Sequence, residues 1–399
     1  MNILYYIPHV SQAGGGARQY ANTLLKIIAQ DAENQYYVLH TNNDTEILHT
    51  IQQNRHLYLI PHNTAKEAKW EKMLNNIIKL INFINSREAG SGKSYNWSYL
   101  NRICKKYKIG VVYSPFQMVP HCNRKVIWTL HDLQELHFPA HFSPEIRATR
   151  ARIGLDNIKR GFHIVVSYQH IKDDIIKYFE VTPQNITVCL LDMQNLWIER
   201  FTQNDIQHDF VRKYPTKFLL YPANTWVHKN HHGLIKCLLY IQEHYQEKIT
   251  VICTGHLTDY YDKELMPLVI KNQLQNQLRF VGVVSEQELY SLYQACWGVV
   301  IPTKYEAGSF PLMESLLLHR PVICSNVTSL PDTIGDDSFV FSPFDMHDMA
   351  QKVIMLWRSE VFRQLSIENS HKQANELHSH RALTIIKTVI DSAKTIMLD

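Results

Sequence analysis

Residues 298–319 read GVVIPTKYEAGSFPLMESLLLH. The short apolar run at 298–301 predicts a buried β-strand, and a glycine-containing loop follows it. Pro311 stands where the first turn of a helix tolerates proline, and the leucines after it predict a helix running to about His319. This strand–loop–helix unit is typical of parallel α/β sheets, in which ligands bind at the carboxyl ends of the strands.

The same alternation of short apolar runs and helical stretches extends over most of the 399 residues. The expected strands are 3–7, 36–40, 57–60, 111–114, 126–130 and 163–167, then 218–222, 249–254, 278–281, 298–302, 322–325 and 338–341. They predict an α/β protein with two Rossmann-like domains, an N-terminal domain of residues 1–201 and a C-terminal domain of residues 202–378. With two such domains, we expect the ligand site in the cleft between them.

Composition limits the class of protein. Hydrophobic residues make up 45% and charged residues 20%, which is typical of a globular chain and excludes a disordered one. The net charge of +4 is too small to indicate a nucleic-acid partner. Seven widely spaced cysteines without a C-x-x-C motif predict reduced thiols, and no apolar run reaches 18 residues. With no signal peptide at the start, we expect a cytoplasmic protein.

Residues 65–108 depart from this pattern because ten basic residues face only three acidic ones, a net charge of +7. Apolar residues recur at helical spacing in the same stretch, from Trp70 to Ile84. A basic amphipathic helix of this kind can lie on an anionic membrane surface, which would make the protein peripheral on the inner membrane face. The alternative is a helix packed on its own sheet with a solvated basic face.

The loop after the strand at 298–301 carries the chemistry. The backbone amides of Gly308, Ser309 and Phe310 lie at the expected helix start, where free N–H groups and the helix dipole favour an anion. Glu306 and Glu314 flank these amides. An anion site between two carboxylates that can bind hydroxyl groups suits a nucleoside-diphosphate sugar. The alternative for Glu314 is that it only complements the helix N-terminus.

The Glu-x7-Glu pattern with its internal Gly-Ser-Phe-Pro resembles the donor-site motif of retaining GT-B glycosyltransferases, family 4 in the usual classification. The resemblance implies that Glu306 contacts the donor sugar and that Glu314 holds the ribose hydroxyls. It also implies two Rossmann-like domains facing a cleft, with the nucleotide sugar bound mainly by the second domain and the acceptor mainly by the first. The sugar would pass to an acceptor hydroxyl with retention of anomeric configuration.

Residues 221–231, YPANTWVHKNH, resemble a signature of O-antigen and capsule transferases within this family. Lys229 falls where the family keeps a lysine against the donor phosphates, and its ammonium could neutralise a leaving diphosphate. The family commonly has an arginine five residues earlier, where this chain has Asn224. The resemblance thus places both residues at the donor, with one charge fewer than usual.

Further matches lie in the first domain. Gly15, Gly16 and Arg18 resemble the family's glycine loop, which approaches the sugar and the acceptor. His131 follows a strand and matches a histidine that lies near the transferred sugar; the alternative is a polar residue that bonds a loop. Residues 379–399 resemble the C-terminal helix that crosses back onto the first domain.

No D-x-D motif for a divalent metal occurs, so we expect no metal and no other cofactor besides the nucleotide-sugar co-substrate. The expected activity is that of a hexosyltransferase-like enzyme in the assembly of bacterial surface polysaccharide or another glycoconjugate, acting on a glycan, lipid-linked or protein acceptor. The alternatives are a catalytically inactive partner subunit that binds nucleotide sugar, and a GT-B epimerase or phosphorylase. The sequence names neither the sugar nor the acceptor.

Overall fold

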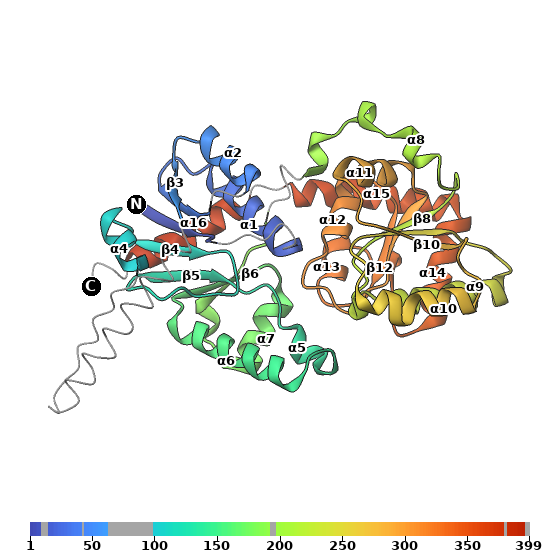
Figure 1. Cartoon of the computed structure of the whole chain (residues 1–399), viewed down its shortest axis with the longest axis horizontal. Helices are drawn as coiled ribbons and strands as arrows, with labels where there is room; N and C mark the ends of the chain where they lie inside the picture. The colour runs from blue at the N-terminus through green and yellow to red at the C-terminus, as the bar shows by residue number, and fades with distance from the viewer. Residues whose placement is uncertain (9–14, 42–43, 63–98, 192–196, 379–380, 396–399) are drawn as a thin grey trace. The chain divides into compact units, whose positions relative to one another are not determined.

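The computed structural model describes residues 1–8, 15–41, 44–62, 99–191, 197–378 and 381–395. The chain divides into two compact units, each a parallel sheet with helices on both faces (Figure 1). Unit 1 consists of Met1–Leu133, Phe142–Leu191 and His380–Asp399, and unit 2 of Gln134–His141 and Asp192–Ser379. The predicted fold class, α/β with two Rossmann-like units, is confirmed. The division at 191/192 lies ten residues before the expected boundary at 201/202, and Gln134–His141 groups with unit 2 rather than with its sequence neighbours.

Unit 1 contains a seven-stranded sheet with the order β3-β2-β1-β4-β5-β6-β7. Its strands are β1 (Asn2–Tyr6), β2 (Gln35–His40), β3 (Leu57–Pro61), β4 (Val111–Ser114), β5 (Lys125–Thr129), β6 (His163–Val166) and β7 (Ile186–Val188). Its described helices are α1 (Gly15–Ile28), α2 (Thr45–Gln53), α4 (Tyr99–Lys106), α6 (Pro144–Arg160), α7 (Gln169–Phe179) and α16 (Arg381–Thr395). The strand order reverses between β1 and β4, which is the switch point of a doubly wound sheet.

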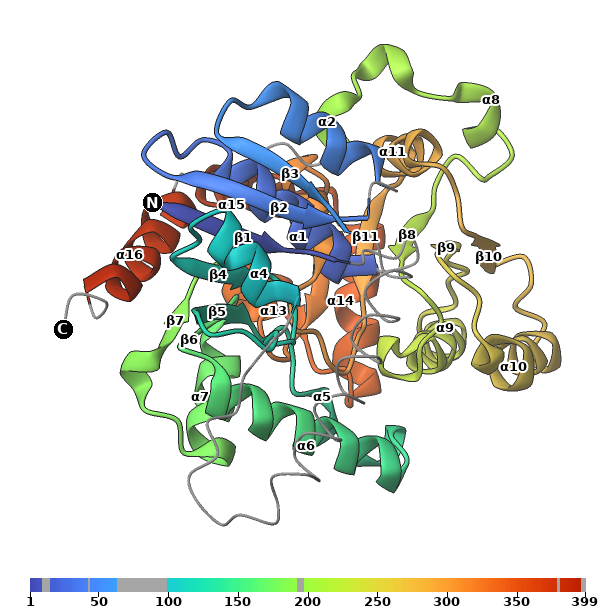
Figure 2. The same cartoon turned by 60° about the vertical axis from the view of Figure 1, so that its left-hand side comes forward.

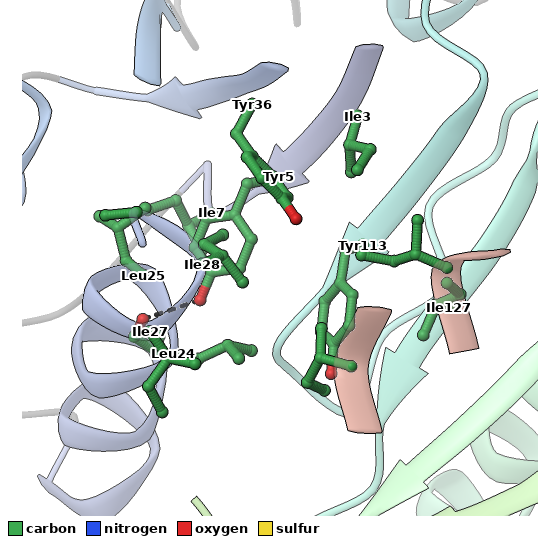
Figure 3. Close-up of a cluster of buried hydrophobic side chains, with 14 of the residues drawn as sticks. Ile3, Tyr5, Ile7, Leu24, Leu25, Ile27, Ile28, Tyr36, Tyr113 and Ile127 are labelled. Atoms are coloured by element: carbon green, nitrogen blue, oxygen red, sulfur yellow. Dashed lines mark hydrogen bonds between the residues drawn. The ribbon is translucent and has the colours of Figure 1, made fainter. Parts of the chain in front are cut away.

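The core of unit 1 forms where α1 and α16 bury their apolar faces. On α1, Leu24, Leu25 and Ile28 point toward Tyr5 on β1, whose hydroxyl donates to the carbonyl of Ala21 at 2.7 Å (Figure 3). Figure 2 shows α16 in red beside this sheet, and it contacts β4 and β5. Its buried residues are Ala382, Ile386, Val389, Ile390 and Ala393. Their helical spacing explains why the C-terminal segment returns to unit 1, as the resemblance implied.

Unit 2 contains a six-stranded sheet with the order β10-β9-β8-β11-β12-β13. Its strands are β8 (Leu219–Pro222), β9 (Val251–Thr254), β10 (Leu278–Gly282), β11 (Gly298–Ile301), β12 (Val322–Ser325) and β13 (Val340–Phe341). Its helices are α5 (Gln134–His137), α8 (His208–Val211), α9 (His231–Tyr245), α10 (Met266–Lys271), α11 (Glu286–Ala295), α12 (Phe310–Leu317), α13 (Leu330–Ile334), α14 (Met346–Arg358) and α15 (Glu360–Leu377). The order reverses between β8 and β11, so the loops after these two strands are neighbours at the carboxyl edge.

Most of the basic stretch 65–108 lies outside the described residues, and so does the predicted membrane contact that depends on it. Its described end forms α4, which buries Leu100, Ile103 and Cys104 in unit 1. No helix within the described ranges is both long and apolar enough to cross a bilayer. All seven cysteines fall within the described part of the chain and are free thiols.

Candidate active site

An ion pair lies at the switch point of the unit 2 sheet. The Lys229 ammonium lies 2.8 Å from Oε1 and 2.6 Å from Oε2 of Glu306, so it bridges both carboxylate oxygens. Lys229 comes from the loop after β8, and Glu306 from the loop after β11. Their side chains are only 17% and 11% exposed, and this burial makes each charge dependent on the other. The structure thus brings together two residues that the sequence assigned to the donor from separate motifs.

Buried hydrogen bonds fix the loop after β8 against the loop after β11. Asn230 has a left-handed backbone (φ 59°), and its side-chain amide donates to the carbonyl of Pro302 at 2.9 Å. Its Oδ1 accepts from the amide of Gly233 at 3.1 Å and so caps α9. The glycine is required there, because a Cβ would lie 2.5 Å from the Asn230 side chain. The carbonyl of His228 accepts from the amide of Lys304 at 2.7 Å. The position of Lys229 is therefore fixed by its neighbours on both sides.

Helix α12 begins at Phe310, directly after the loop that carries Glu306. Ser309 is its buried N-cap, and the serine Oγ accepts from the amide of Leu312 at 3.4 Å. No acidic residue occupies the first turn of α12. The start of the helix lies where the sequence predicted an anion site, at Gly308–Phe310, and the Ser309 hydroxyl is used for capping. Binding of an anion there remains a prediction.

Glu314 lies inside α12 and is 5% exposed. Its Oε1 accepts from the indole Nε1 of Trp197 at 2.8 Å, and its Oε2 accepts from the hydroxyl of Tyr293 at 2.9 Å. Burial and the neighbouring carboxylate raise the pKa of Tyr293, which keeps this hydroxyl a hydrogen-bond donor. No sequence motif indicates either partner. Trp197 follows the last strand of unit 1 by several residues, and Tyr293 looks like an ordinary core position of α11.

Asn224, in the loop after β8, bonds the loop after β9. Its Oδ1 accepts from the backbone amide of His256 at 2.7 Å, which joins the loops after β8 and β9. Gly255, in the second loop, has φ +119°, and a Cβ there would lie 2.8 Å from the backbone of Ala223. The two backbones thus approach too closely for any side chain at this position. Where the family has an arginine, the amide oxygen of Asn224 bonds this neighbouring loop.

The predicted residues of unit 1 form their own set of contacts. His131 follows β5, and its Nε2 bonds the carbonyl of Pro115 at 2.9 Å, which makes Nε2 the donor and leaves the lone pair on Nδ1. Burial lowers its pKa, so the neutral form is favoured. Arg18 pairs with Asp44 at 2.9 Å and braces α1 against α2.

Gly15 and Gly16 belong to the first turn of α1 rather than to a loop. A role for these two glycines and Arg18 at the acceptor remains a prediction.

A segment from the middle of the unit 1 sequence packs beside the ion pair in unit 2. The rings of His137 and Phe138 lie 5.5 Å and 6.0 Å from the ring of Tyr305, which directly precedes Glu306. Tyr305 is buried. This contact was not predictable from the sequence, because the two segments are far apart along the chain and no motif links them. Among the residues that the structure describes, no cluster of three or more His, Cys, Asp or Glu side chains could hold a metal ion.

Comparison with known proteins agrees with this geometry. Residues 203–373, which include Lys229, Glu306 and Glu314, match the family model described as glycosyl transferases group 1. These residues make up most of unit 2 and less than half of the whole chain. O-antigen chain mannosyltransferase B of Escherichia coli is 23% identical over 68% of this chain and 71% of its own length. O-antigen chain mannosyltransferase RfbU of Salmonella typhimurium is 24% identical over 62% of this chain and 65% of its own length.

Solved structures show the same GT-B architecture for the whole chain. Anabaena Alr3699/HepE, in complex with UDP and glucose, superposes with a TM-score of 0.69 at 16% identity, covering 99% of this chain and 100% of its own. WaaG, described as a glycosyltransferase involved in lipopolysaccharide biosynthesis, superposes with a TM-score of 0.65 at 13% identity, covering 96% and 99%. The ion pair and the carboxylate on α12 thus lie within the residues that match the group 1 model, in a chain with the GT-B fold.

Proposed function

We propose that this chain is a retaining glycosyltransferase that moves a sugar from a nucleoside diphosphate to an acceptor hydroxyl during assembly of a bacterial surface polysaccharide. The observation that carries the proposal is the Lys229–Glu306 ion pair beside the start of α12, at the switch point where α/β sheets bind ligands. Mannose is the first sugar to test, because the curated relatives are O-antigen mannosyltransferases.

The charges suit a reaction in which a diphosphate departs. The Lys229 ammonium and the amides at the start of α12 would stabilise the negative charge that develops on the leaving phosphate. Glu306 would face the sugar, on which positive charge develops as the bond breaks. Glu306 is already paired with the Lys229 ammonium, so we do not propose it as the base that takes the acceptor proton. The acceptor hydroxyl would attack the anomeric carbon from the face that the diphosphate leaves, and its proton would pass to the leaving phosphate. The new bond then forms on the face where the old bond breaks, so the anomeric configuration is retained.

The same arrangement leads us to propose that no metal is needed, since Lys229 supplies the charge that a divalent ion would otherwise provide. The acceptor is proposed to be a glycan carried on a lipid, and the location the cytoplasmic membrane face. Liposome flotation of the full chain tests the location. Equal recovery with neutral and anionic vesicles at low salt would rule out electrostatic attachment.

The decisive experiment incubates the full chain with mannosyl and glucosyl nucleotides, with and without EDTA, and with lipid-linked glycan acceptors. Proton NMR of the product reads the anomeric configuration. We expect release of nucleoside diphosphate that depends on acceptor, persists in EDTA and gives a product with the anomeric configuration of the donor. An inverted product would refute the retaining mechanism, and full loss in EDTA restored by Mg²⁺ would refute metal independence. No transfer from any sugar nucleotide would refute the function itself.

A further inference from the structure

One hydroxyl outside the assigned motifs bonds both backbone polar groups of Glu306. Thr328 lies in the loop between β12 and α13. Its Oγ1 accepts from the amide of Glu306 at 3.3 Å and donates to the carbonyl of the same residue. The Oγ of Ser329 lies 3.5 Å from that carbonyl as well. A threonine hydroxyl can donate one bond and accept others, so a single side chain holds the peptide units on both sides of the Glu306 Cα.

The backbone of Thr328 is a second, independent observation. Its φ is +48°, in the left-handed region, which a β-branched residue rarely adopts because Cβ crowds the backbone. Glycine or asparagine is the usual residue for such a position. A strained conformation of this kind persists only where the surrounding structure holds it, and such positions cluster at functional sites. Here the strain places the hydroxyl against Glu306.

We propose that Thr328 is a positioning residue for Glu306. It acts through the backbone of Glu306, so that the carboxylate stays paired with Lys229 and oriented toward the donor sugar. This inference rests on the proposed function. Glu306 belongs to no helix or strand, so no regular backbone ladder fixes its orientation. Without the hydroxyl its peptide can rotate and carry the carboxylate away from Lys229. A displacement of about 1 Å at a reacting group can cost about a hundredfold in rate.

The test compares substitutions that separate the hydroxyl from the shape of the side chain. Thr328→Val keeps the branched shape and loses the hydroxyl, whereas Thr328→Ser keeps the hydroxyl. We expect Thr328→Val to lower kcat by about tenfold or more with little change in nucleoside-diphosphate affinity, and Thr328→Ser to stay within about threefold of the wild type. Thr328→Gly fits the left-handed backbone without a side chain, so it should fold well and still lose activity.

Thr333→Val is the matched control. It removes the hydroxyl of a buried threonine on α13, which bonds the carbonyl of Ser329 at 2.7 Å and not Glu306. We expect its kcat to stay near that of the wild type. If Thr328→Val and Thr328→Gly both turn over within about twofold of the wild type, the proposal is overturned. It is also overturned if Thr328→Ser loses as much activity as Thr328→Val.

A readout without catalysis separates this inference from the proposed function. Lys229 in its ion pair should react slowly with an acetylating reagent, and mass spectrometry of the full chain gives the rate at that residue. We expect Thr328→Val to raise this rate several-fold and Thr328→Ser to leave it unchanged. If the wild type transfers no sugar but the acetylation pattern holds, the function fails and the positioning role stands. Equal rates in all variants overturn the positioning role.

Discussion

At the scale of single residues, the two side chains expected to meet the donor instead meet each other. The sequence predicted Lys229 and Glu306 as donor residues but not their contact, because they are 77 positions apart and belong to different motifs. A largely buried charge without its partner is costly, so each residue of the pair stabilises the other before any ligand binds. If Lys229 binds the donor as we propose, the diphosphate must share or replace Glu306 as the partner of the ammonium.

This competition predicts an unusual result for Glu306→Gln. The glutamine no longer neutralises Lys229, so free nucleoside diphosphate should bind about threefold to tenfold more tightly. Turnover should fall by about a hundredfold, because the charge that we propose to face the sugar is lost. Calorimetric titration and a turnover assay measure the two effects. The control is Glu286→Gln, which removes an exposed carboxylate on α11. A folded Glu306→Gln protein that binds the diphosphate more weakly than the wild type would contradict the competition.

His231 gives a prediction for acid stability. Its ring lies between those of Tyr221 and Phe280, at 4.7 Å and 5.6 Å, and neither ring nitrogen has a hydrogen-bond partner. Burial, with smaller contributions from the charges of Lys229 and His228, lowers its pKa to about 3. Below its ordinary pKa of about 6.5 the unfolded chain takes up a proton that the folded chain refuses. The free energy of unfolding therefore falls as the pH drops from about 6.5 toward 3.

His231→Phe should make this fall shallower, by up to about 1.4 kcal/mol per pH unit between pH 6 and pH 4. Phenylalanine keeps a ring between the two neighbours and has no nitrogen to protonate. Urea unfolding at several pH values measures the slopes. His49→Phe, at an exposed position of α2, is the control and should leave the slope unchanged. Identical slopes for the wild type and His231→Phe would show that this buried imidazole does not contribute.

At the scale of elements, hydrophobic pattern predicted the strands well, because buried parallel strands are short apolar runs. Val111–Ser114 and Val322–Ser325 match the expected ranges, and most others differ by one or two residues. The edge strand β7, only three residues long, gave no comparable signal. The motif residues of the candidate site could be named from the sequence, and their roles at a donor stay predictions, whereas Trp197, Tyr293 and Thr328 could not be named. Their roles depend on which loops and helices pack together, and no local pattern encodes that.

The Glu314 cluster joins three elements and predicts a coupled effect on stability. Trp197 belongs to the short helix Trp197–Arg200, Tyr293 to α11 and Glu314 to α12. Trp197→Phe and Tyr293→Phe each remove one donor from a buried carboxylate, which should cost about 1–3 kcal/mol in the free energy of unfolding. Each should also weaken nucleoside-diphosphate binding, by loosening the carboxylate proposed to hold the ribose.

A double-mutant cycle tests the cluster as a unit. Because both donors serve one carboxylate, we expect the double variant to differ from the sum of the single variants by at least about 0.5 kcal/mol. Trp226→Phe is the matched control, since Trp226 is 51% exposed in the loop after β8. Strictly additive effects, with nucleotide affinity unchanged, would mean that the two hydrogen bonds do not position Glu314.

At the scale of the whole molecule, the chain passes between its two units at four places: after Leu133, His141, Leu191 and Ser379. Two of these passages bound Gln134–His141, which packs its rings on Tyr305 in unit 2. This short segment is joined covalently to unit 1 at both ends and held by side-chain contacts in unit 2. A substitution that weakens these ring contacts should therefore change the position of Tyr305, the residue next to Glu306.

Phe138→Ala is the direct test of this link. Phe138 is half-buried, so truncation should cost about 1–3 kcal/mol in the free energy of unfolding, less than the roughly 3–5 kcal/mol of a fully buried phenylalanine. Loss of the ring also frees Tyr305 to move, so kcat should fall with little change in diphosphate affinity. His137→Ala, at an exposed position, should have a smaller effect on both. Thermal unfolding measures the change in stability, and steady-state kinetics measures the change in kcat. Phe344→Ala is the control, because that ring is 69% exposed. If Phe138→Ala behaves like Phe344→Ala in both assays, the segment only connects the units and does not support the site.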